Sequence, residues 1–274
     1  MSAADVTTGD LSIARLTIFP VKGLRGVDVD EARITPFGLE GDRRYMLVDQ
    51  GGTFISQRGH PQLTHIEVEA AGDAWRFSLE GHDSLSIPRA GVPDGEEVQV
   101  DIWGDPVLAR HAGAHASNWF SRVLGDLLRL VWMPESAFRP IEPGYAPVGS
   151  RVSFADGYPV LLLSRASVVE LNSRLMEPVS EDRFRANIMV DGSAAWAEDG
   201  WKSIQTRDAT LELVKPCARC VVITTDQQTG ERFKEPTATL ATYRKREGKV
   251  MVGINALASP VDAWIRTGDA LTAT

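Results

Sequence analysis

Short, closely spaced strand-like runs in the first half of the chain are the feature that most constrains its fold. Apolar, β-branched and aromatic residues form brief segments there, and glycine, proline and aspartate interrupt them. Turn sequences such as Asp49-Gln50-Gly51-Gly52 and Glu80-Gly81-His82-Asp83 separate neighbouring runs. This pattern is typical of an antiparallel sheet or a small barrel. Strands are expected at residues 11–19, 31–34, 45–48, 53–55, 65–69, 75–79, 98–102 and 106–110.

The second half mixes strands with a few helices. Trp119, Phe120, Val123 and Leu124 recur at helical spacing, a Ser-x-x-Glu capping box opens at Ser167, and Pro236 suits a first helical residue. Helices are therefore expected at 116–124, from 167 to 175 and after 236. Four prolines predict an irregular loop over 134–147. Further strands are expected at 159–163, 183–190, 211–214, 221–226, 250–255 and 270–271, which makes the chain a strand-dominated α+β protein.

Length and charge narrow the class of protein. The 274 residues suffice for one large or two modest domains with a proper core, and the formal charge of −8 argues against nucleic-acid and anionic-membrane partners. No apolar run approaches the roughly 20 residues of a membrane span, and the N-terminus lacks the pattern of a signal peptide. A cytoplasmic protein with about ten disordered leading residues is expected.

Both cysteines of the chain lie in Lys215-Pro216-Cys217-Ala218-Arg219-Cys220. The pair is compatible with half of a zinc site, a redox dithiol, a single metal-binding thiolate or two buried apolar residues. A zinc site would need a second pair of ligands, and the sequence downstream offers none. A thioredoxin-like motif would precede a helix, whereas Val221 and Val222 follow here. The thiols are expected to be free unless a ligand binds them.

Basic residues gather at the predicted ends of strands. Lys22 and Arg25 follow the first strand at a glycine-containing turn, and Arg43, Arg44 and Arg58 flank the third. A guanidinium binds phosphate or carboxylate with two parallel hydrogen bonds, so these side chains form a candidate anion clamp with Arg183 and Arg185. Ordinary surface ion pairing is the alternative for any one of them.

The sequence lacks the motifs that are typical of several classes of enzyme. No Gly-x-Gly-x-x-Gly turn, phosphate-binding Gly-Lys-Ser/Thr loop or Gly-x-Ser-x-Gly elbow is present. His111 and His115 have helical metal-ligand spacing, but Gly113 between them favours a surface pair at a helix entry. A nucleotide-dependent enzyme and a serine hydrolase are therefore disfavoured.

In chain order, these segments resemble proteins with an N-terminal MOSC β-barrel domain followed by a MOSC domain. The resemblance covers nearly the whole chain and implies a small barrel-like domain over residues 10–110, packed on a MOSC β-barrel domain over 111–274. Its motifs are Phe19-Pro20-Val21-Lys22-Gly23, residues 38–49, Ser56-Gln57-Arg58, Arg183 to Ile188, the cysteine segment, and residues 224–244.

The resemblance implies a molybdenum cofactor, in which a phosphate-bearing pterin dithiolene holds molybdenum together with one protein cysteine. Cys220 matches the metal ligand, and Cys217 becomes its neighbour. The residues expected around the pterin and its phosphate are Lys22, Gly23, Arg44, Arg58, Gly157, Tyr158, Arg185, Asn187 and Asn255. Asp156 lines the same expected pocket and is the candidate acid.

The resemblance also implies an oxidoreductase, independent of pyridoxal phosphate, that reduces hydroxylamines, amidoximes and N-hydroxylated bases. Some bacterial relatives carry a cysteine-rich ferredoxin domain that is missing here, so electrons are expected from a separate flavin or iron–sulfur protein. The late Phe-Gly-Gln-Asn pattern of the family is Val252-Gly253-Ile254-Asn255 in this chain, which alters one pocket wall. A molybdenum-cofactor or sulfur carrier without turnover, and an inactive binding module, are the alternatives.

Overall fold

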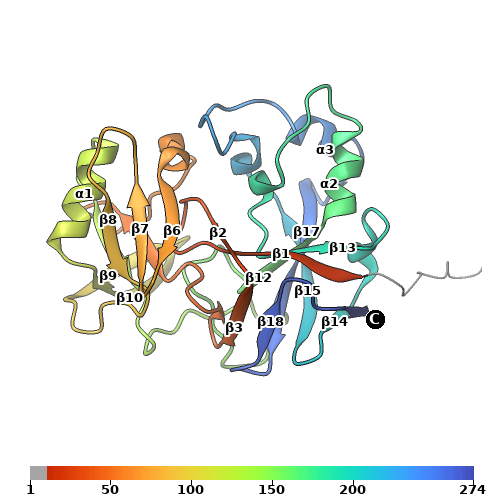
Figure 1. The fold of residues 1–274 in the computed structure, drawn as a ribbon, viewed down its shortest axis with the longest axis horizontal. Helices are drawn as coiled ribbons and strands as arrows, with labels where there is room; N and C mark the ends of the chain where they lie inside the picture. Colours follow the sequence, from red (N-terminus) through yellow and green to blue (C-terminus); the bar gives the residue numbers. More distant parts are fainter. Residues whose placement is uncertain (1–10) are drawn as a thin grey trace, which may run out of the picture.

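The computed structural model describes residues 11–274, and the expected disordered lead lies outside them. The strand-dominated α+β fold is confirmed: strands form four sheets, and the three α-helices lie at their edges and faces (Figure 1). One lobe carries α1 and β6 to β10, and the other carries the largest sheet with α2 and α3. No helix among residues 11–274 combines the length and apolar character needed to cross a membrane.

The largest sheet forms the frame of the second lobe. All its pairings are antiparallel except that of β12 with β13. Its strand order is β19 (Thr272–Ala273), β14 (Ser203–Gln205), β15 (Thr210–Ala218), β17 (Lys249–Ser259), β12 (Val160–Ser164), β13 (Ile188–Asp191), β1 (Ser12–Ile18) and β2 (Val27–Val29), with β16 (Lys245–Arg246) paired to β17.

Three smaller antiparallel sheets complete the strands. They are β5 (Tyr45–Val48), β11 (Arg129–Trp132), β10 (Asp105–His111) and β9 (Glu97–Ile102); β18 (Trp264–Arg266), β3 (Glu31–Thr35) and β4 (Gly38–Leu39); and β6 (Glu67–Ala71), β7 (Ala74–Ser78) and β8 (Leu85–Pro88). The helices are α1 (Ala114–Leu124), α2 (Arg165–Asn172) and α3 (Thr237–Tyr243), with 3₁₀ turns η1 (Pro61–His65), η2 (Glu181–Phe184), η3 (Ala197–Gly200) and η4 (Val221–Thr224).

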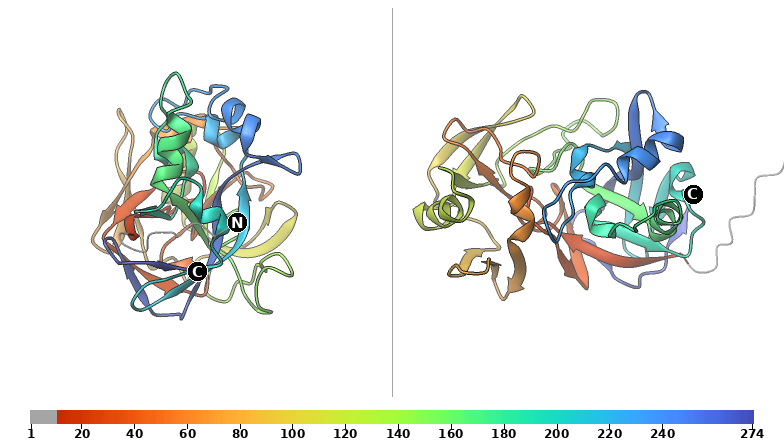
Figure 2. Two further views of the ribbon diagram at one scale, coloured as in Figure 1. Left: turned by 90° about the vertical axis from the view of Figure 1, so that its right-hand side faces the viewer. Right: turned by 90° about the horizontal axis from the view of Figure 1, so that it is seen from above.

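Strands from the first part of the sequence pair with strands from its last part. β1 pairs with β13 through Leu16 and Ile188, and β3 pairs with β18 near the end of the chain. Conversely, α1 packs on β8 and β11, and β11 joins β5 and β10, so this stretch beyond residue 110 lies with the first lobe. The expected domain boundary after residue 110 therefore falls at the end of β10, inside one lobe (Figure 2).

One hydrophobic cluster extends through both lobes. Leu16 and Leu211 from the large sheet belong to the same cluster of buried residues as Trp75 on β7 and Trp119 on α1. Burial of apolar surface contributes about 25 cal/mol per Å², so a cluster of this kind is the main term that holds the lobes together. The walls of any cavity between the lobes are fixed by this packing.

Some expected strands are corrected by the structure. Residues 183–190 begin in η2, and Arg185 has a left-handed backbone (φ 53°) that ends the turn before β13 starts at Ile188. Residues 221–226 form η4 and an extended exit, although their β-branched side chains favour strands. Residues 53–55 make only isolated bridges, and the strand expected at 270–271 is β19, two residues later.

The capping box expected at Ser167 is absent from α2. Ser164 occupies the N-cap position without a side-chain capping bond, and Ser167 lies within the helix. The Ser167 hydroxyl donates to the buried carboxylate of Glu198 at 2.7 Å, so a long-range partner takes the place of the local cap. The helix beginning near Ala116 is confirmed as α1, as are the strands at 45–48 and 98–102.

Candidate functional site

A cavity of about 570 Å³ lies where the two lobes meet. Its walls come from the turn after β1, the segment after β5, the loop before β12, the η2–β13 connection, and β15 with the cysteine loop. Ten of the residues expected around the cofactor line this cavity: Lys22, Gly23, Arg58, Asp156, Gly157, Tyr158, Arg185, Asn187, Cys220 and Asn255. Arg44 does not line it, nor do Arg25 and Arg183 of the candidate anion clamp.

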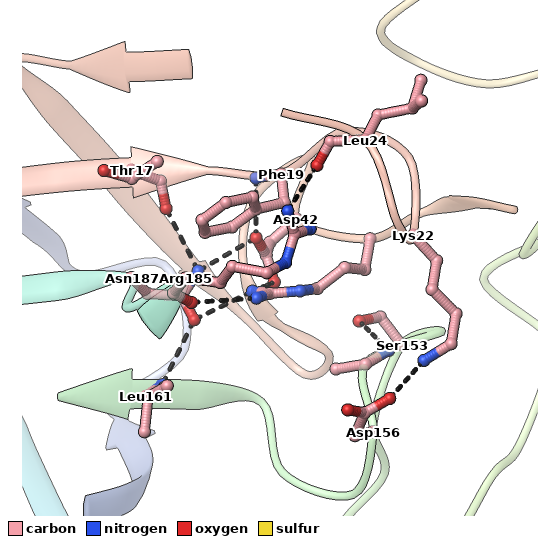
Figure 3. Close-up of polar contacts among 12 residues, drawn as sticks. Thr17, Phe19, Lys22, Leu24, Asp42, Ser153, Asp156, Leu161, Arg185 and Asn187 are labelled. Atoms are coloured by element: carbon pink, nitrogen blue, oxygen red, sulfur yellow. Dashed lines mark hydrogen bonds and ion pairs between the residues drawn. The ribbon is translucent and has the colours of Figure 1, made fainter. Parts of the chain in front are cut away.

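Lys22 is the most deeply placed cation of the cavity. It is 7% exposed, and its ammonium lies 2.5 Å from Asp156 Oδ1 (Figure 3) and 5.1 Å from the centre of the Phe54 ring. Burial lowers the pKa of Lys22, and the Asp156 carboxylate opposes that shift. The protein atoms around Asp156 in the cavity oppose its ionisation although its side chain is 70% exposed, but Lys22 outweighs this effect and holds the pKa of the carboxyl below its usual range. Asp156 is therefore ionised at neutral pH.

Arg43 and Asn187 form a buried polar network with Asp42. Asp42 is 0% exposed; one carboxylate oxygen accepts from Arg43 at 2.7 Å, and the other accepts from the Asn187 amide at 2.9 Å. The same amide nitrogen also donates to the Thr17 carbonyl, and the Asn187 carbonyl oxygen accepts from Arg43 and the Leu161 amide. All these groups are satisfied, so the network fixes the Arg43 guanidinium in one orientation.

Arg185 lines the cavity without a carboxylate partner among the described residues. One of its terminal nitrogens donates to the Leu24 carbonyl at 2.7 Å (Figure 3), and its guanidinium lies 4.4 Å from the centre of the Phe19 ring. Arg43 lies 4.3 Å from the same ring. Burial and the neighbouring Arg43 cation lower the pKa of Arg185. Two cations that share one aromatic ring favour an anion between or beside them.

Arg44 lies outside the cavity, so its expected place at the anion site is corrected. Its side chain contacts the Phe37 and Trp132 rings and donates to Glu135 and to the Met133 carbonyl. Its neighbour Arg43 lines the cavity instead. The reason is local geometry, because Arg43 has a left-handed backbone (φ 47°) in the turn before β5.

The cysteine loop forms another wall of the cavity. Cys217 is the penultimate residue of β15, and Cys220 precedes η4 as its N-cap residue; both cysteines are free and half-buried. Arg219 lies between them, with one terminal nitrogen 3.0 Å from Cys217 Sγ and the other donating to the Phe184 carbonyl. Its Nε is buried and has no hydrogen-bond partner among the described residues. Sequence reasoning missed Arg219, although its place between two cysteines was a usable signal.

A second polar group closes the side of the cavity near β15. Glu142, from the proline-rich loop, accepts from the Tyr158 hydroxyl at 3.0 Å and from the Lys215 ammonium at 2.5 Å. Burial and the Glu142 carboxylate raise the pKa of Tyr158. Asn255 pairs with Leu161 and Lys215 across the sheet. These contacts tie the loop to the strand that leads into the cysteines.

The side chains in the cavity suit a ligand with an anionic end and an affinity for thiolate. Lining cations outnumber lining acids, and the buried Nε of Arg219 lacks an acceptor. Among residues 11–274, no three histidine, cysteine or acidic side chains gather as a protein-only metal site would require. A metal that brings its own sulfur ligands and takes one cysteine from the protein fits this donor set.

The sequence matches two protein-family models and several characterised relatives. Residues 10–127 match the model of the MOSC N-terminal beta barrel domain, and residues 149–272 match that of the MOSC domain. The chain is 32% identical over 245 residues to mitochondrial amidoxime-reducing component 1 of Homo sapiens, covering 85% of this chain and 72% of the relative. It is 30% identical to mitochondrial amidoxime reducing component 2 of Bos taurus, with the same coverage. A molybdenum cofactor sulfurase of Oryza sativa is 28% identical over 92% of this chain but only 33% of its own length.

Proposed function

Because this chain belongs to the MOSC-domain family that includes the mitochondrial amidoxime-reducing components, we propose that it binds a molybdenum cofactor and reduces N-hydroxylated compounds. Its relatives tie the protein to the molybdenum cofactor in general, since a cofactor sulfurase is among them. The observation that carries the finer proposal is the convergence of Lys22, Arg43 and Arg185 in the cavity that the cysteine loop also lines.

The three cations would hold the pterin phosphate. Lys22 and the Asp42-oriented guanidinium of Arg43 are fixed by the protein, so they bind an anion with little loss of side-chain entropy. Arg185 adds a cation with no carboxylate of its own among the described residues. The backbone of Gly23, at φ 88°, brings the chain to the cavity wall beside Lys22. Arg43 thus replaces Arg44 in the expected anion site.

Cys220 would supply the single protein thiolate to the metal, and Arg219 would place a cation beside the cysteine pair. When bound, the cofactor supplies a redox metal that exchanges two electrons and accepts oxygen. The overall conversion cleaves the N–O bond of an R–NHOH substrate with two electrons and two protons, giving R–NH₂ and water. A separate flavin or iron–sulfur protein would provide the electrons.

Asp156 would not provide either proton at neutral pH. The ion pair with Lys22 keeps its carboxyl ionised, so it acts as the counter-ion of Lys22. The protons would come from solvent that enters the open cavity, next to the polar groups of Tyr158 and Lys215. This assignment replaces the expected role of Asp156 as the acid.

The test compares metal content and turnover in the two cysteine variants. Protein from a cofactor-producing host should contain near-stoichiometric molybdenum by mass spectrometry and should reduce benzamidoxime with reduced methyl viologen. Cys220→Ala should lose the molybdenum, and its turnover should fall by at least about 100-fold. Removing a residue that only hydrogen-bonds to a metal ligand typically costs about 10–100-fold, and removing the ligand itself should cost more. Cys217→Ala is the matched control and should retain metal and most activity. A fully active Cys220→Ala protein would refute the assignment.

A cofactor or sulfur carrier is the second candidate, and the alignment with the rice sulfurase along 92% of this chain favours it. Such a protein would hold the same cofactor through the same cations but would not turn over substrate. Molybdenum-loaded protein that reduces no N-hydroxylated compound with viologen, yet passes cofactor or sulfur to an acceptor enzyme, would support the carrier.

A further inference from the structure

Trp103 lies in a turn whose backbone suits other types of residue. With Gly104 it connects β9 to β10, and Ile102 pairs with Asp105 on either side of the turn. Trp103 and Gly104 have φ angles of 59° and 91°. A two-residue hairpin turn with two positive φ angles favours Asn, Asp or Gly. A tryptophan at this position, 49% exposed, indicates that its ring has a role beyond the turn.

The Trp103 ring contacts two residues of the cavity wall. The Arg58 guanidinium lies 4.4 Å from the ring centre, and the Phe54 ring meets it edge-on, with 4.7 Å between the centroids. Arg58 and Phe54 both line the cavity, and Phe54 is the ring beside the Lys22 ammonium. Trp103 therefore supports the wall of the cavity at the end where Lys22 lies.

Arg58 is a cation of the cavity that the proposed anion site does not use. Its backbone is held, because its amide donates to the Ser56 hydroxyl at 3.3 Å and its carbonyl accepts from Arg232 at 2.7 Å. Its guanidinium forms no hydrogen bond or ion pair with another side chain or carbonyl within residues 11–274. The N–H groups of Arg58 therefore have no protein acceptor in the described part of the chain.

Asp156 is the carboxylate that competes for Arg58. The protein atoms around Asp156 oppose its ionisation, but Lys22 and, after it, Arg58 lower its pKa, so the guanidinium is close enough to act on the carboxylate. Only Asp156 Oδ1 accepts from Lys22 (Figure 3), and Oδ2 accepts no hydrogen bond from any residue between 11 and 274. Arg58 could thus pair with Oδ2, yet it lies over Trp103 instead.

We infer that Trp103 is a positioning residue, which holds the Arg58 guanidinium away from Asp156 and so presents it to the phosphate of the ligand in the cavity. The inference rests on the proposed function for the identity of that ligand, the pterin phosphate, and adds a fourth cation to the three already described. A guanidinium held over an aromatic face keeps its N–H groups available, so it can bind phosphate through two hydrogen bonds.

The experiment measures the Kd for inorganic phosphate by isothermal titration of the full chain without cofactor. Trp103→Asn removes the ring and leaves a residue that the turn favours, so the hairpin should persist. Arg58→Gln removes the cation itself, and Trp103→Phe keeps an aromatic face. Trp264→Ala is the control, because Trp264 is a 36% exposed tryptophan on β18 that does not line the cavity.

Trp103→Asn and Arg58→Gln should each raise the Kd on the order of tenfold, because a hydrogen bond between charged groups is lost. Trp103→Phe should retain most of the affinity, since phenylalanine also offers a π face to the guanidinium. Trp264→Ala should bind phosphate as wild type does. Melting temperatures show whether each variant is folded.

Asp156→Asn separates positioning from mere structural support. In this background Arg58 has no carboxylate to pair with, so adding Trp103→Asn should change the Kd by less than about twofold. Asp156→Asn also releases Lys22, but that change is common to both proteins of the pair and cancels. A structural role for Trp103 would instead give the same loss of affinity in both backgrounds.

Molybdenum content identifies the source of the phosphate. Protein from a cofactor-producing host should contain less molybdenum in Trp103→Asn and Arg58→Gln than in Trp264→Ala. Weaker phosphate binding with unchanged molybdenum would assign Arg58 to a free or substrate phosphate and overturn the pterin as its ligand.

The positioning role would be overturned by unchanged phosphate affinity in Trp103→Asn, by an equal loss in Trp264→Ala, or by the same loss with and without Asp156. Absence of phosphate binding by the wild type would overturn it as well. Failure of the proposed function would look different, because the wild type would then contain no molybdenum while the phosphate titrations still followed Trp103 and Asp156.

Discussion

The cation side and the cysteine side of the cavity are built in contrasting ways. Lys22 is buried, and Arg43 is held by Asp42 and Asn187, which are themselves enclosed in the core between the lobes. The cysteine side is a half-buried loop that continues directly into the exposed Val221. The cation side therefore has few degrees of freedom, whereas the cysteine side remains close to solvent.

This difference separates two requirements of the redox site that we propose. An anion clamp gains affinity from groups that are positioned before the ligand arrives. A metal that receives electrons from another protein must instead lie near the surface. The fold meets both requirements by placing the clamp at the junction of the lobes and the thiol at a strand end.

The largest expected effect comes from breaking the cation side at Asp42. In Asp42→Ala, the buried Arg43 guanidinium and the Phe19 amide both lose their acceptor, so the free energy of unfolding should fall by about 3–5 kcal/mol. Urea denaturation measures the change. Glu69→Ala is the control, because Glu69 and its partner Arg76 are both exposed, and it should cost only about 0–1 kcal/mol. Equal losses would show that Asp42 is no more structural than a surface acid.

A middle-sized effect is expected from inorganic phosphate on cofactor-free protein. Phosphate should raise the melting temperature, with a stabilisation of about 2.7 kcal/mol when its concentration is 100 times Kd. Arg185→Leu should abolish most of this response, because Arg185 is the one cation of Lys22, Arg43 and Arg185 that has no carboxylate partner among residues 11–274. Cys220→Ala should keep it, since the thiol belongs to the other side. Loss of the response in Cys220→Ala would show that the two sides are not independent.

The smallest effect concerns acid stability at Asp156. Its pKa in the folded protein lies below the unfolded value, so the Lys22 ion pair contributes stability above about pH 4 and loses it as the pH falls further. Asp156→Asn should therefore be slightly less stable than wild type at pH 7, and the gap should close toward pH 2. The effect is small because the Asp156 side chain is 70% exposed. Thermal melts at both pH values test this, and a constant gap would contradict it.

Local patterns in the sequence were enough for most strands and for the loop that holds the cysteines. They failed where a residue leaves the common backbone regions. Arg43 and Arg185 both have positive φ angles, and no side-chain pattern in the sequence predicts this. Arg44 was therefore placed at the anion site in place of Arg43, and a strand was expected through Arg185. The β-branched run after Cys220 became a 3₁₀ turn because tertiary packing of Ile223 and Thr224 outweighed local preference.

Long-range pairing was also beyond the reach of sequence patterns. Nothing local indicates that β1 pairs with β13 or that Asn187 bonds to Thr17 and Asp42. The anion clamp was anticipated as a set of residues, but its internal scaffold was not. The missing information is the order of strands in the large sheet, which depends on contacts between distant parts of the chain.

The pairing of β1 with β13 also sets the order in which the protein can be completed. Lys22 leaves the ribosome early, and the strand before it, β1, can pair with β2 soon afterwards, but its other edge remains open until residues 188–191 of β13 have been made. Arg185 arrives just before that moment, and Cys220 arrives later still. No partial chain contains the finished cavity, so the proposed cofactor, which would need both sides, could be inserted only into protein whose synthesis is nearly over.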